Sequence, residues 1–386
     1  MIIEPKVKGF ICMTAHPEGC KENVKRQISY IKKSGTTQGP KKVLVIGAST
    51  GYGLASRIAA TYACGAATIG IMYEKPASER RTATPGWYNT KAFEEMAAED
   101  GYYAKSINGD AFTNDIKAQT IDLIKKDLGK VDMVIYSLAA PRRTMPDGTI
   151  YNSTLKSVGK EFTNKSLNLN NNTVTEGTIA AATQEEVLST IKVMGGEDWK
   201  DWITALADSD VLSDQAITIA YSYIGPELTY PVYYNGTIGL AKKHLLNTSE
   251  EITKEFAVKK VRAYISINKA IVTQASSAIP IVPLYFAILY KVMKEKGNHE
   301  GCIEQMGRLF HEKLKPSYVE VDDENRIRLD DYEMQKDIQA EVMERWNRIN
   351  NENVSELADL CGYWEDFYHM FGFRYSNIDY AKDVEI

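Results

Sequence analysis

The stretch Lys41–Gly65, KKVLVIGASTGYGLASRIAATYACG, decides the fold class. Its first part, 41–49, is an apolar run rich in β-branched residues that ends in a glycine turn. A run that is apolar on both faces predicts a buried parallel strand. The second part, 52–65, has helical spacing and a terminal glycine, which predicts a helix that ends there. We therefore interpret the stretch as strand, turn and helix.

The same alternation continues on the C-terminal side. Further buried strands are predicted at 67–74, 102–107, 131–139, 216–225 and 261–268, and helices at 89–101 (with Asn89 as the cap), 114–129, 184–194 and 198–207. Strands that alternate with helices predict an α/β, Rossmann-type doubly wound parallel sheet. We expect residues 1–386 to form a single elaborated domain. Its parts would be a core at 41–139, an insertion of loops or hairpins at 140–195, and a largely helical remainder at 196–386.

Composition excludes several classes of protein. The net charge of −5 argues against nucleic-acid binding, and the five scattered cysteines predict reduced thiols in a cytoplasmic protein. Residues 270–290 carry no charge, but two prolines and a polar first half predict a loop followed by a buried helix, and no membrane insertion. Cys12, His16 and Cys20 lack a fourth ligand nearby in the sequence, so we expect no metal.

The turn after the first strand has the features of a phosphate cradle. It reads Gly47-Ala48-Ser49-Thr50-Gly51-Tyr52-Gly53. Glycines at this place permit a tight turn and a close approach of the backbone to a pyrophosphate at the helix N-terminus. Tyr73-Glu74 ends the next strand, where a carboxylate would bind ribose hydroxyls and repel a 2′-phosphate. The pattern therefore predicts NADH as cofactor in preference to NADPH.

Two further strand ends fit the same ligand. Asp110-Ala111 follows the third strand and Leu138-Ala139 follows the fourth. Ligands bind at the carboxyl ends of parallel strands, so we assign both pairs to the cofactor site. A turn residue after Gly109 is the alternative interpretation of Asp110.

Tyrosines and lysines are crowded in the stretch Thr229–Leu246, TYPVYYNGTIGLAKKHLL. Tyr233 and Lys242 are nine residues apart and would face opposite sides of one continuous helix. Asn235-Gly236 predicts a break that would let the two side chains cooperate. Packing is the alternative role for these tyrosines. We reject the pairs Tyr290/Lys294 and Tyr332/Lys336 as catalytic, since neither adjoins a strand's carboxyl end.

Three segments resemble the FabV-type enoyl reductases, which include the trans-2-enoyl-CoA reductases. They are GASTGYG (47–53), YSYIGPELTYPVYYNGTIGLAK (221–242) with its Tyr-x8-Lys spacing, and VTQASSAIPIVPLY (272–285). The resemblance implies a monomeric, NADH-dependent enzyme with an enlarged short-chain-reductase-like fold that carries extra N-terminal, insertion and C-terminal elements. It implies that Tyr233 is catalytic, that Lys242 holds the cofactor ribose and that Tyr223 contacts substrate. It also implies that the Ile271-Val272-Thr273 loop lies against the nicotinamide end.

The expected reaction is reduction of the C2=C3 double bond of a trans-2-enoyl-CoA, with hydride delivered to C3. Tyr233 would stabilise or protonate the enolate, and Lys242 would make the phenol proton more available. An apolar helix at 279–290 would line an acyl tunnel or simply belong to the core. Two alternatives stay open: an enoyl-ACP reductase of type II fatty-acid synthesis, and a non-catalytic NAD-binding sensor or scaffold. The source of the C2 proton also stays open.

Overall fold

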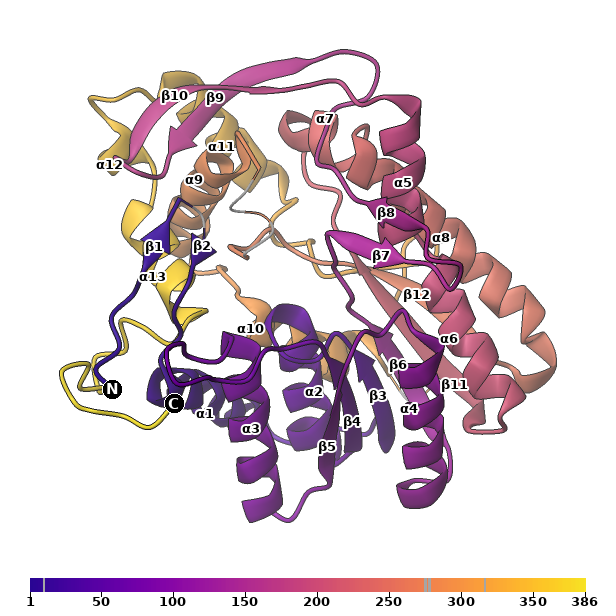
Figure 1. Ribbon diagram of the computed structural model, residues 1–386. Coiled ribbons are helices and arrows are strands. Elements are labelled where there is room, and N and C mark those ends of the chain that lie inside the picture. The colour runs from indigo at the N-terminus through magenta and orange to yellow at the C-terminus, as the bar shows by residue number, and fades with distance from the viewer. Residues whose placement is uncertain (10, 274–275, 277–278, 316) are drawn as a thin grey trace.

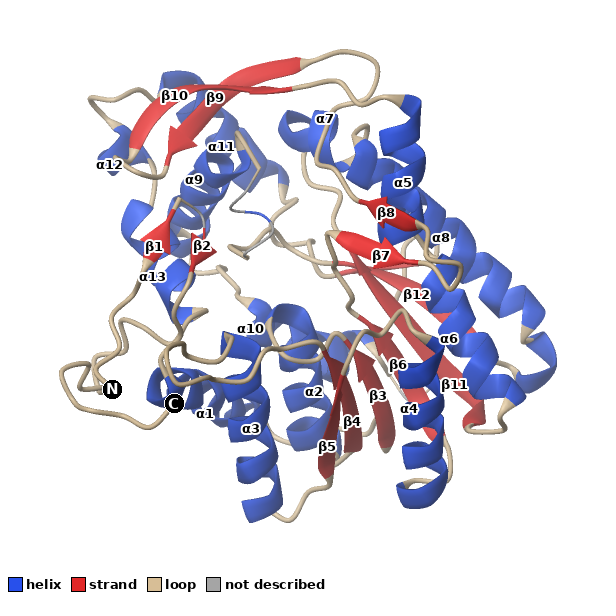
Figure 2. Cartoon of the chain, viewed as in Figure 1, coloured by secondary structure: helices blue, strands red, loops and turns tan. Residues whose placement is uncertain are grey.

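The computed structural model describes residues 1–9, 11–273, 276, 279–315 and 317–386. Its centre is a seven-stranded sheet in which every neighbouring pair is parallel (Figures 1 and 2). In spatial order the strands are β13 (Arg326–Arg328), β12 (Arg262–Ile267), β11 (Leu212–Ser222), β6 (Val131–Tyr136), β3 (Lys42–Ile46), β4 (Ala67–Met72) and β5 (Ala104–Asn108). The order reverses at β3, so the predicted doubly wound α/β fold is confirmed.

Helices cover both faces of the sheet. One face packs against α1 (Pro17–Ser34), α2 (Gly51–Cys64), α3 (Pro85–Glu99) and α10 (Cys302–Arg308). The other packs against α4 (Asn114–Asp127), α6 (Glu197–Asp208) and α8 (Thr237–Glu255). Successive residues of β3 point to opposite faces, so Val43 and Val45 enter the first core and Leu44 and Ile46 the second. This explains why the strand reads as an unbroken apolar run.

A third core forms around α9 (Val282–Glu295), beside the sheet (Figure 1). It adds α11 (Lys336–Arg348), α12 (Val354–Leu357), α13 (Leu360–His369) and the hairpin of β9 (Phe162–Asn168) and β10 (Thr173–Ile179). Two smaller hairpins pair β1 (Val7–Lys8) with β2 (Ile11–Cys12), and β7 (Arg142–Thr144) with β8 (Ile150–Asn152). The 140–195 segment thus contains two hairpins and α5 (Gln184–Met194).

Some expected boundaries were wrong. Helix α3 begins at Pro85, so Asn89 is an interior, buried residue and not its cap. Its side-chain amide donates to the Ser49 carbonyl at 3.2 Å and so supports the cradle. The apolar helix begins at Val282 and runs on to Glu295. The short strand β13 has no counterpart among the predicted elements.

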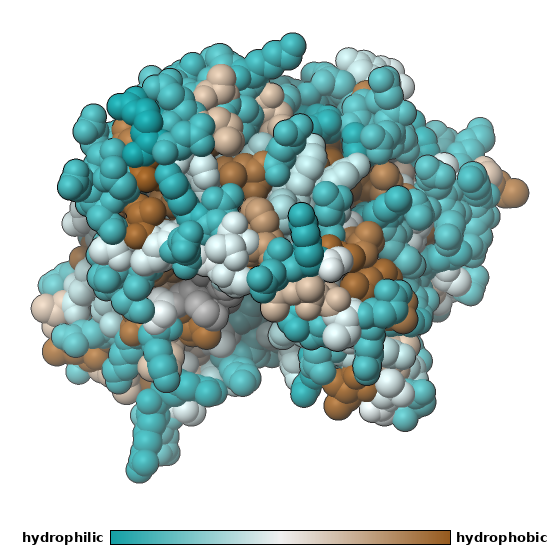
Figure 3. Space-filling model, turned by 90° about the horizontal axis from the view of Figure 1, so that it is seen from above, coloured by the Kyte–Doolittle hydropathy of each residue, from teal (hydrophilic) through white to brown (hydrophobic). Residues whose placement is uncertain are grey.

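The length and apolarity of the helices in the described residues bear on whether the chain could cross a membrane. In the described part of the chain, no helix combines the length and apolarity that crossing a bilayer requires. Figure 3 shows one face on which hydrophilic side chains predominate and hydrophobic ones lie in small, separate groups. That face therefore offers no large continuous apolar area.

Candidate active site

The turn between β3 and α2 has the geometry of an anion cradle. Gly47 has a φ of +84°, and a Cβ at that position would lie 2.6 Å from the Ser137 carbonyl oxygen. A Cβ at Gly53 would lie 1.8 Å from the Gly47 oxygen, so the helix can approach the turn only with glycine there. Thr50 makes no side-chain capping bond, and the space next to Gly51 is open. The N-terminus of α2 thus has room and backbone N–H groups for a pyrophosphate.

Glu74 lies beside this cradle, at the carboxyl end of β4. The Ser49 hydroxyl donates to Glu74 Oε1 at 2.6 Å. The side chain of Asn108, the last residue of β5, pairs with the Glu74 backbone N–H at 2.8 Å and carbonyl at 2.9 Å. Gly86 leaves the carboxylate its space, because a Cβ there would lie 2.1 Å from Oε1. Tyr73 projects outward and is 78% exposed.

The other two predicted strand ends differ in character. Asp110 Oδ1 accepts from the backbone N–H of Phe112 at 3.0 Å, which is the turn role that was left open for it. Ala111 is buried, and its carbonyl accepts from the Trp202 indole at 3.1 Å. Leu138 and Ala139 directly follow β6 and lie next to the cradle, since the Leu138 Cα is 3.2 Å from a Cβ placed on Gly47.

The expected break between Tyr233 and Lys242 is present. Tyr233 ends the short helix α7 (Tyr230–Tyr233), and α8 begins at Thr237. Gly236 allows α7 and α8 to lie close together, because a Cβ there would lie 2.3 Å from the Val232 carbonyl oxygen. The Lys242 ammonium reaches the carboxyl end of β11, where it donates to the Tyr221 carbonyl at 2.8 Å. Burial lowers the pKa of Lys242 to about 8.

Tyr233 and Tyr223 form an edge-to-face pair with ring centroids 4.7 Å apart. Tyr233 is 9% exposed, and within the described chain its hydroxyl makes no hydrogen bond that would prevent it from meeting a ligand. Burial first, and the negative charge of Glu333 second, raise the pKa of Tyr233. This direction is opposite to the one we expected from Lys242, so the phenol of Tyr233 holds its proton firmly.

The residues before and within the Ile271–Thr273 loop are fixed from several sides. Tyr52, in the cradle, donates its hydroxyl to the Lys269 carbonyl at 2.7 Å. The Val272 N–H donates to the Tyr290 hydroxyl at 3.0 Å. Ile271 and Val272 are buried, and the Thr273 N–H donates to the Ser276 hydroxyl at 2.8 Å. The structure therefore links this loop to the cradle. Residues 274–275 and 277–278 of the motif lie outside the described residues.

The two rejected tyrosine–lysine pairs have other partners. Tyr290 accepts the Val272 N–H described above, while Lys294 is 41% exposed and forms an ion pair with Asp359 at 2.6 Å. The ring of Tyr332 lies 4.0 Å from the Arg308 guanidinium. In neither pair does the lysine contact its tyrosine through a hydrogen bond, within the residues that the structure describes.

His16, of the Cys12, His16 and Cys20 group, has a structural role in the described chain. His16 Nδ1 accepts from the Gly19 N–H at 3.3 Å and so caps α1. Among the described residues, no group of three or more His, Cys, Asp or Glu side chains could hold a metal ion.

Sequence reasoning missed two residues at this edge of the sheet, Asn108 and Glu333. Asn108 ends β5, and its side chain bonds the backbone of Glu74, so the strand-end rule used for Asp110 would have found it two positions earlier. Glu333 accepts the Tyr223 hydroxyl at 2.8 Å and the Ala270 N–H at 2.7 Å. It follows β13, whose three residues are too few to show a period-two pattern.

Three family models match consecutive parts of the chain. They describe the NAD(P)H-binding domain of trans-2-enoyl-CoA reductase (residues 2–79), the catalytic region of trans-2-enoyl-CoA reductase (81–315) and an enoyl reductase FAD-binding domain (321–384).

In the groove that it forms with α9, the segment 321–384 has a lining that does not suit FAD. Its groove against α9, of about 680 Å³, is lined by five acidic and three basic side chains, and an acidic majority would repel a flavin's pyrophosphate. The N-terminus of α13 is already capped, since Asp359 Oδ1 accepts from the Gly362 N–H at 2.8 Å. We therefore derive no flavin step.

Relatives match the whole chain. The trans-2-enoyl-CoA reductase [NADH] of Ruminiclostridium cellulolyticum is 54% identical, with 100% of this chain and 98% of that protein covered. The enoyl-[acyl-carrier-protein] reductase [NADH] of Flavobacterium johnsoniae is 56% identical with the same coverage.

Solved structures agree with this relationship. The Clostridium acetobutulicum trans-2-enoyl-CoA reductase in complex with NADH has a TM-score of 0.97 and 45% identity over 100% of this chain and 98% of that one. The Treponema denticola trans-2-enoyl-CoA reductase in complex with NAD has a TM-score of 0.96 and 49% identity at the same coverage. This chain belongs to the trans-2-enoyl-CoA reductase family.

Proposed function

We propose that this protein uses NADH to reduce the C2=C3 double bond of a trans-2-enoyl thioester, with crotonyl-CoA as the type of substrate. The observation that carries the proposal is that Lys242 reaches the carboxyl end of β11 while Tyr233 packs on Tyr223, which directly follows that strand. A break in the backbone brings the lysine ammonium to the carboxyl end of β11 and leaves the Tyr233 hydroxyl without a described protein partner. A sensor or scaffold would have no need of this pair.

The residues that would hold NADH lie along successive strand ends. The N-terminus of α2 would take the pyrophosphate, Glu74 the adenosine ribose hydroxyls, and Lys242 the nicotinamide ribose. Asp110-Ala111 would lie at the adenine, and Leu138-Ala139 would pass the nicotinamide ribose. The Ile271–Thr273 loop would close over the nicotinamide, which supplies a hydride to C3 when bound.

Tyr233 would act on the thioester oxygen. As hydride reaches C3, negative charge develops on that oxygen, and a phenol placed to donate a hydrogen bond stabilises it. The raised pKa of Tyr233 keeps the phenol protonated, so it enters the reaction as a donor. Lys242 adds positive charge beside the ribose, where it favours the charged transition state over the neutral substrate.

The thioester carrier is the point on which the relatives divide. Some are named for enoyl-CoA and others for enoyl-[acyl-carrier-protein], at nearly equal identity. We therefore retain enoyl-ACP reduction as the second candidate. NADH oxidation at 340 nm with crotonyl-CoA, longer enoyl-CoAs and an enoyl-ACP tests both. No oxidation with any of them would overturn the proposal.

Tyr233→Phe tests the assignment of the phenol. Because the variant removes one donor to the developing oxyanion and little volume, kcat should fall about 10²- to 10³-fold. The NADH Kd, followed by nucleotide fluorescence, should stay close to that of the unchanged protein. Tyr234→Phe is the matched control, since Tyr234 is 53% exposed and stacks on Tyr230. Normal turnover by Tyr233→Phe would move the donor role elsewhere.

A further inference from the structure

Glu333 is a fully buried acid whose carboxylate faces three hydrogen-bond donors. Its Oε1 accepts from the hydroxyls of Tyr223 at 2.8 Å and Tyr285 at 2.6 Å, and its Oε2 accepts from the Ala270 N–H at 2.7 Å. The Tyr285 oxygen itself accepts from the Gln339 side-chain amide at 3.3 Å, so its O–H is free to point at Glu333. Three converging donors match an acceptor-only carboxylate.

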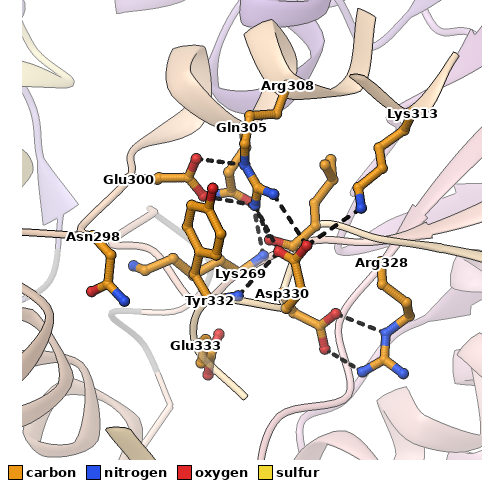
Figure 4. A network of polar contacts seen from close by, with 12 residues as sticks. Lys269, Asn298, Glu300, Gln305, Arg308, Lys313, Arg328, Asp330, Tyr332 and Glu333 are labelled. Atoms are coloured by element: carbon orange, nitrogen blue, oxygen red, sulfur yellow. Dashed lines mark hydrogen bonds and ion pairs between the residues drawn. The ribbon is translucent and has the colours of Figure 1, made fainter. Parts of the chain in front are cut away.

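The two acids that precede Glu333 in the sequence, Asp330 and Asp331, form ion pairs. Asp330 pairs with Arg328 at 2.7 Å, and Asp331 with Arg308 at 2.8 Å. Figure 4 shows Asp330 facing Arg328, while Glu333 stands apart from that ion-pair cluster. Glu333 has no ion pair to an arginine in the described chain. One of its donors, Tyr223, belongs to the candidate active site, and another, Ala270, directly precedes the Ile271–Thr273 loop. A buried acid that forms no ion pair with an arginine is a candidate for a functional role.

One carboxylate thus holds both sides of the reacting centre. Tyr223 packs edge-on against Tyr233, and Ala270 directly precedes the Ile271–Thr273 loop. We propose that Glu333 is a positioning residue that fixes Tyr223 on the substrate side and this loop on the nicotinamide side; the proposal rests on the enoyl reductase function above.

The hydrogen-bond direction also defines how Tyr223 meets a substrate. Because its O–H is donated to Glu333, the Tyr223 oxygen presents lone pairs to the pocket and not a proton. Tyr223 therefore serves as a wall and an acceptor. Tyr233 is left to supply the donated hydrogen bond at the thioester oxygen.

Glu333→Gln tests the role. An amide offers one acceptor oxygen to three donors, so at least one bond is lost and the two sides can shift. We expect kcat/KM for crotonyl-CoA to fall about 10- to 100-fold, in line with the effect of small misplacements in active sites. The NADH Kd should change far less, since Tyr52 and Tyr290 still hold the loop.

A double-variant cycle with Tyr223→Phe separates positioning from stability. If Glu333 acts through Tyr223, the losses in kcat/KM do not multiply in Tyr223→Phe/Glu333→Gln. Asp330→Asn is the matched control: it removes a charge from an acid that is 1% exposed, three residues away, and should lower the Tm while kcat/KM stays within about twofold.

The outcomes are distinct. Losses that multiply, an unchanged kcat/KM in Glu333→Gln, or an equal loss in Asp330→Asn would overturn the positioning role. Glu333→Asp keeps the charge and is measured in the same cycle; if neither variant gives folded protein, the carboxylate is a folding determinant and the proposal fails. An unchanged protein that reduces no enoyl thioester would instead overturn the proposed function, and this inference with it.

Discussion

At the residue scale, burial shifts the pKa values of the two proposed catalytic groups in opposite directions. It raises the pKa of Tyr233 and lowers the pKa of Lys242 to about 8, because the neutral form of each group is favoured away from water. Tyr233 therefore keeps its proton across the neutral range. Lys242 is a cation below pH about 8 and a neutral amine above it, whereas an exposed lysine stays charged beyond pH 10.

This difference predicts the pH dependence of NADH binding. As the pH rises through about 8, Lys242 loses the charge that assists its hydrogen bond to the ribose, so the NADH Kd should rise about tenfold. Fluorescence titrations between pH 6.5 and 9.5 measure it. Lys242→Arg is the control, since a guanidinium keeps its charge throughout this range.

If the rise in Kd persists in Lys242→Arg, another group is responsible. Lys269 is the candidate, because burial also lowers its pKa to about 8. A flat profile for the unchanged protein would contradict the ribose role of Lys242.

Glu74 predicts the choice of nucleotide. Its Oε1 accepts from Ser49 at the cradle, where a 2′-phosphate would meet a negative charge. Glu74→Ala removes that repulsion, so the ratio of kcat/KM for NADPH to that for NADH should rise about tenfold or more. Glu79→Ala, a change at an exposed acid on the same connection, should leave the ratio unchanged. An unaltered ratio in Glu74→Ala would place nucleotide selection elsewhere.

At the scale of elements, long periodic segments could be predicted from the sequence and short segments could not. The apolar residues of β3 indicate a buried strand, and the glycines of the cradle indicate a turn. Both elements were predicted because these local patterns are sufficient. β13 has two arginines around one isoleucine, and it becomes a strand only because β12 is there to pair with it. Glu333, placed by β13, was missed for the same reason.

Helix α3 shows how a local rule can give way to tertiary structure. Asn89 is a good N-cap by type, but Thr84 and Pro85 start the helix one turn earlier. The side chain of Asn89 is then used against the cradle, at the Ser49 carbonyl. Thr84 and Asn89 are both suitable N-caps by residue type. Which of them begins the helix depends on how α3 packs beside Glu74.

Lys165 links the β9–β10 hairpin to the C-terminal core. Its ammonium donates to the carbonyls of Trp346, Asn347 and Ile349 at the end of α11, at 2.8–3.1 Å. A cation at a helix C-terminus satisfies free carbonyls and complements the helix dipole. Lys165→Met should lower the free energy of unfolding by about 1–2 kcal/mol in urea titrations. Lys160→Met changes an exposed lysine outside β9 and should change the free energy of unfolding little. An equal decrease in both variants would contradict the capping role of Lys165.

At the scale of the whole molecule, contacts cross the boundaries between the family models. The last of the three models covers residues 321–384, yet β13 from that segment pairs within the central sheet. The N-terminal and C-terminal segments also meet, since the Met1 amino group donates to the Val384 carbonyl at 2.7 Å, and the His16 N–H donates to the Phe371 carbonyl at 2.9 Å. On the basis of these contacts we propose that residues 1–386 form one elaborated domain.

One domain predicts one cooperative unfolding transition. Trp199 and Trp202 lie in a core of the sheet, and Trp346 lies in the core around α9, so tryptophan fluorescence reports on both. Thermal melts followed by fluorescence and by far-ultraviolet circular dichroism should coincide. NADH at about 100 times its Kd should stabilise the folded state by about 2.7 kcal/mol and shift the whole transition. Trp364 also packs against the α9 core, so the double variant Trp346→Phe/Trp364→Phe isolates the sheet signal. A fluorescence melt of this double variant at a higher temperature than that of the unchanged protein would show that the C-terminal core unfolds by itself.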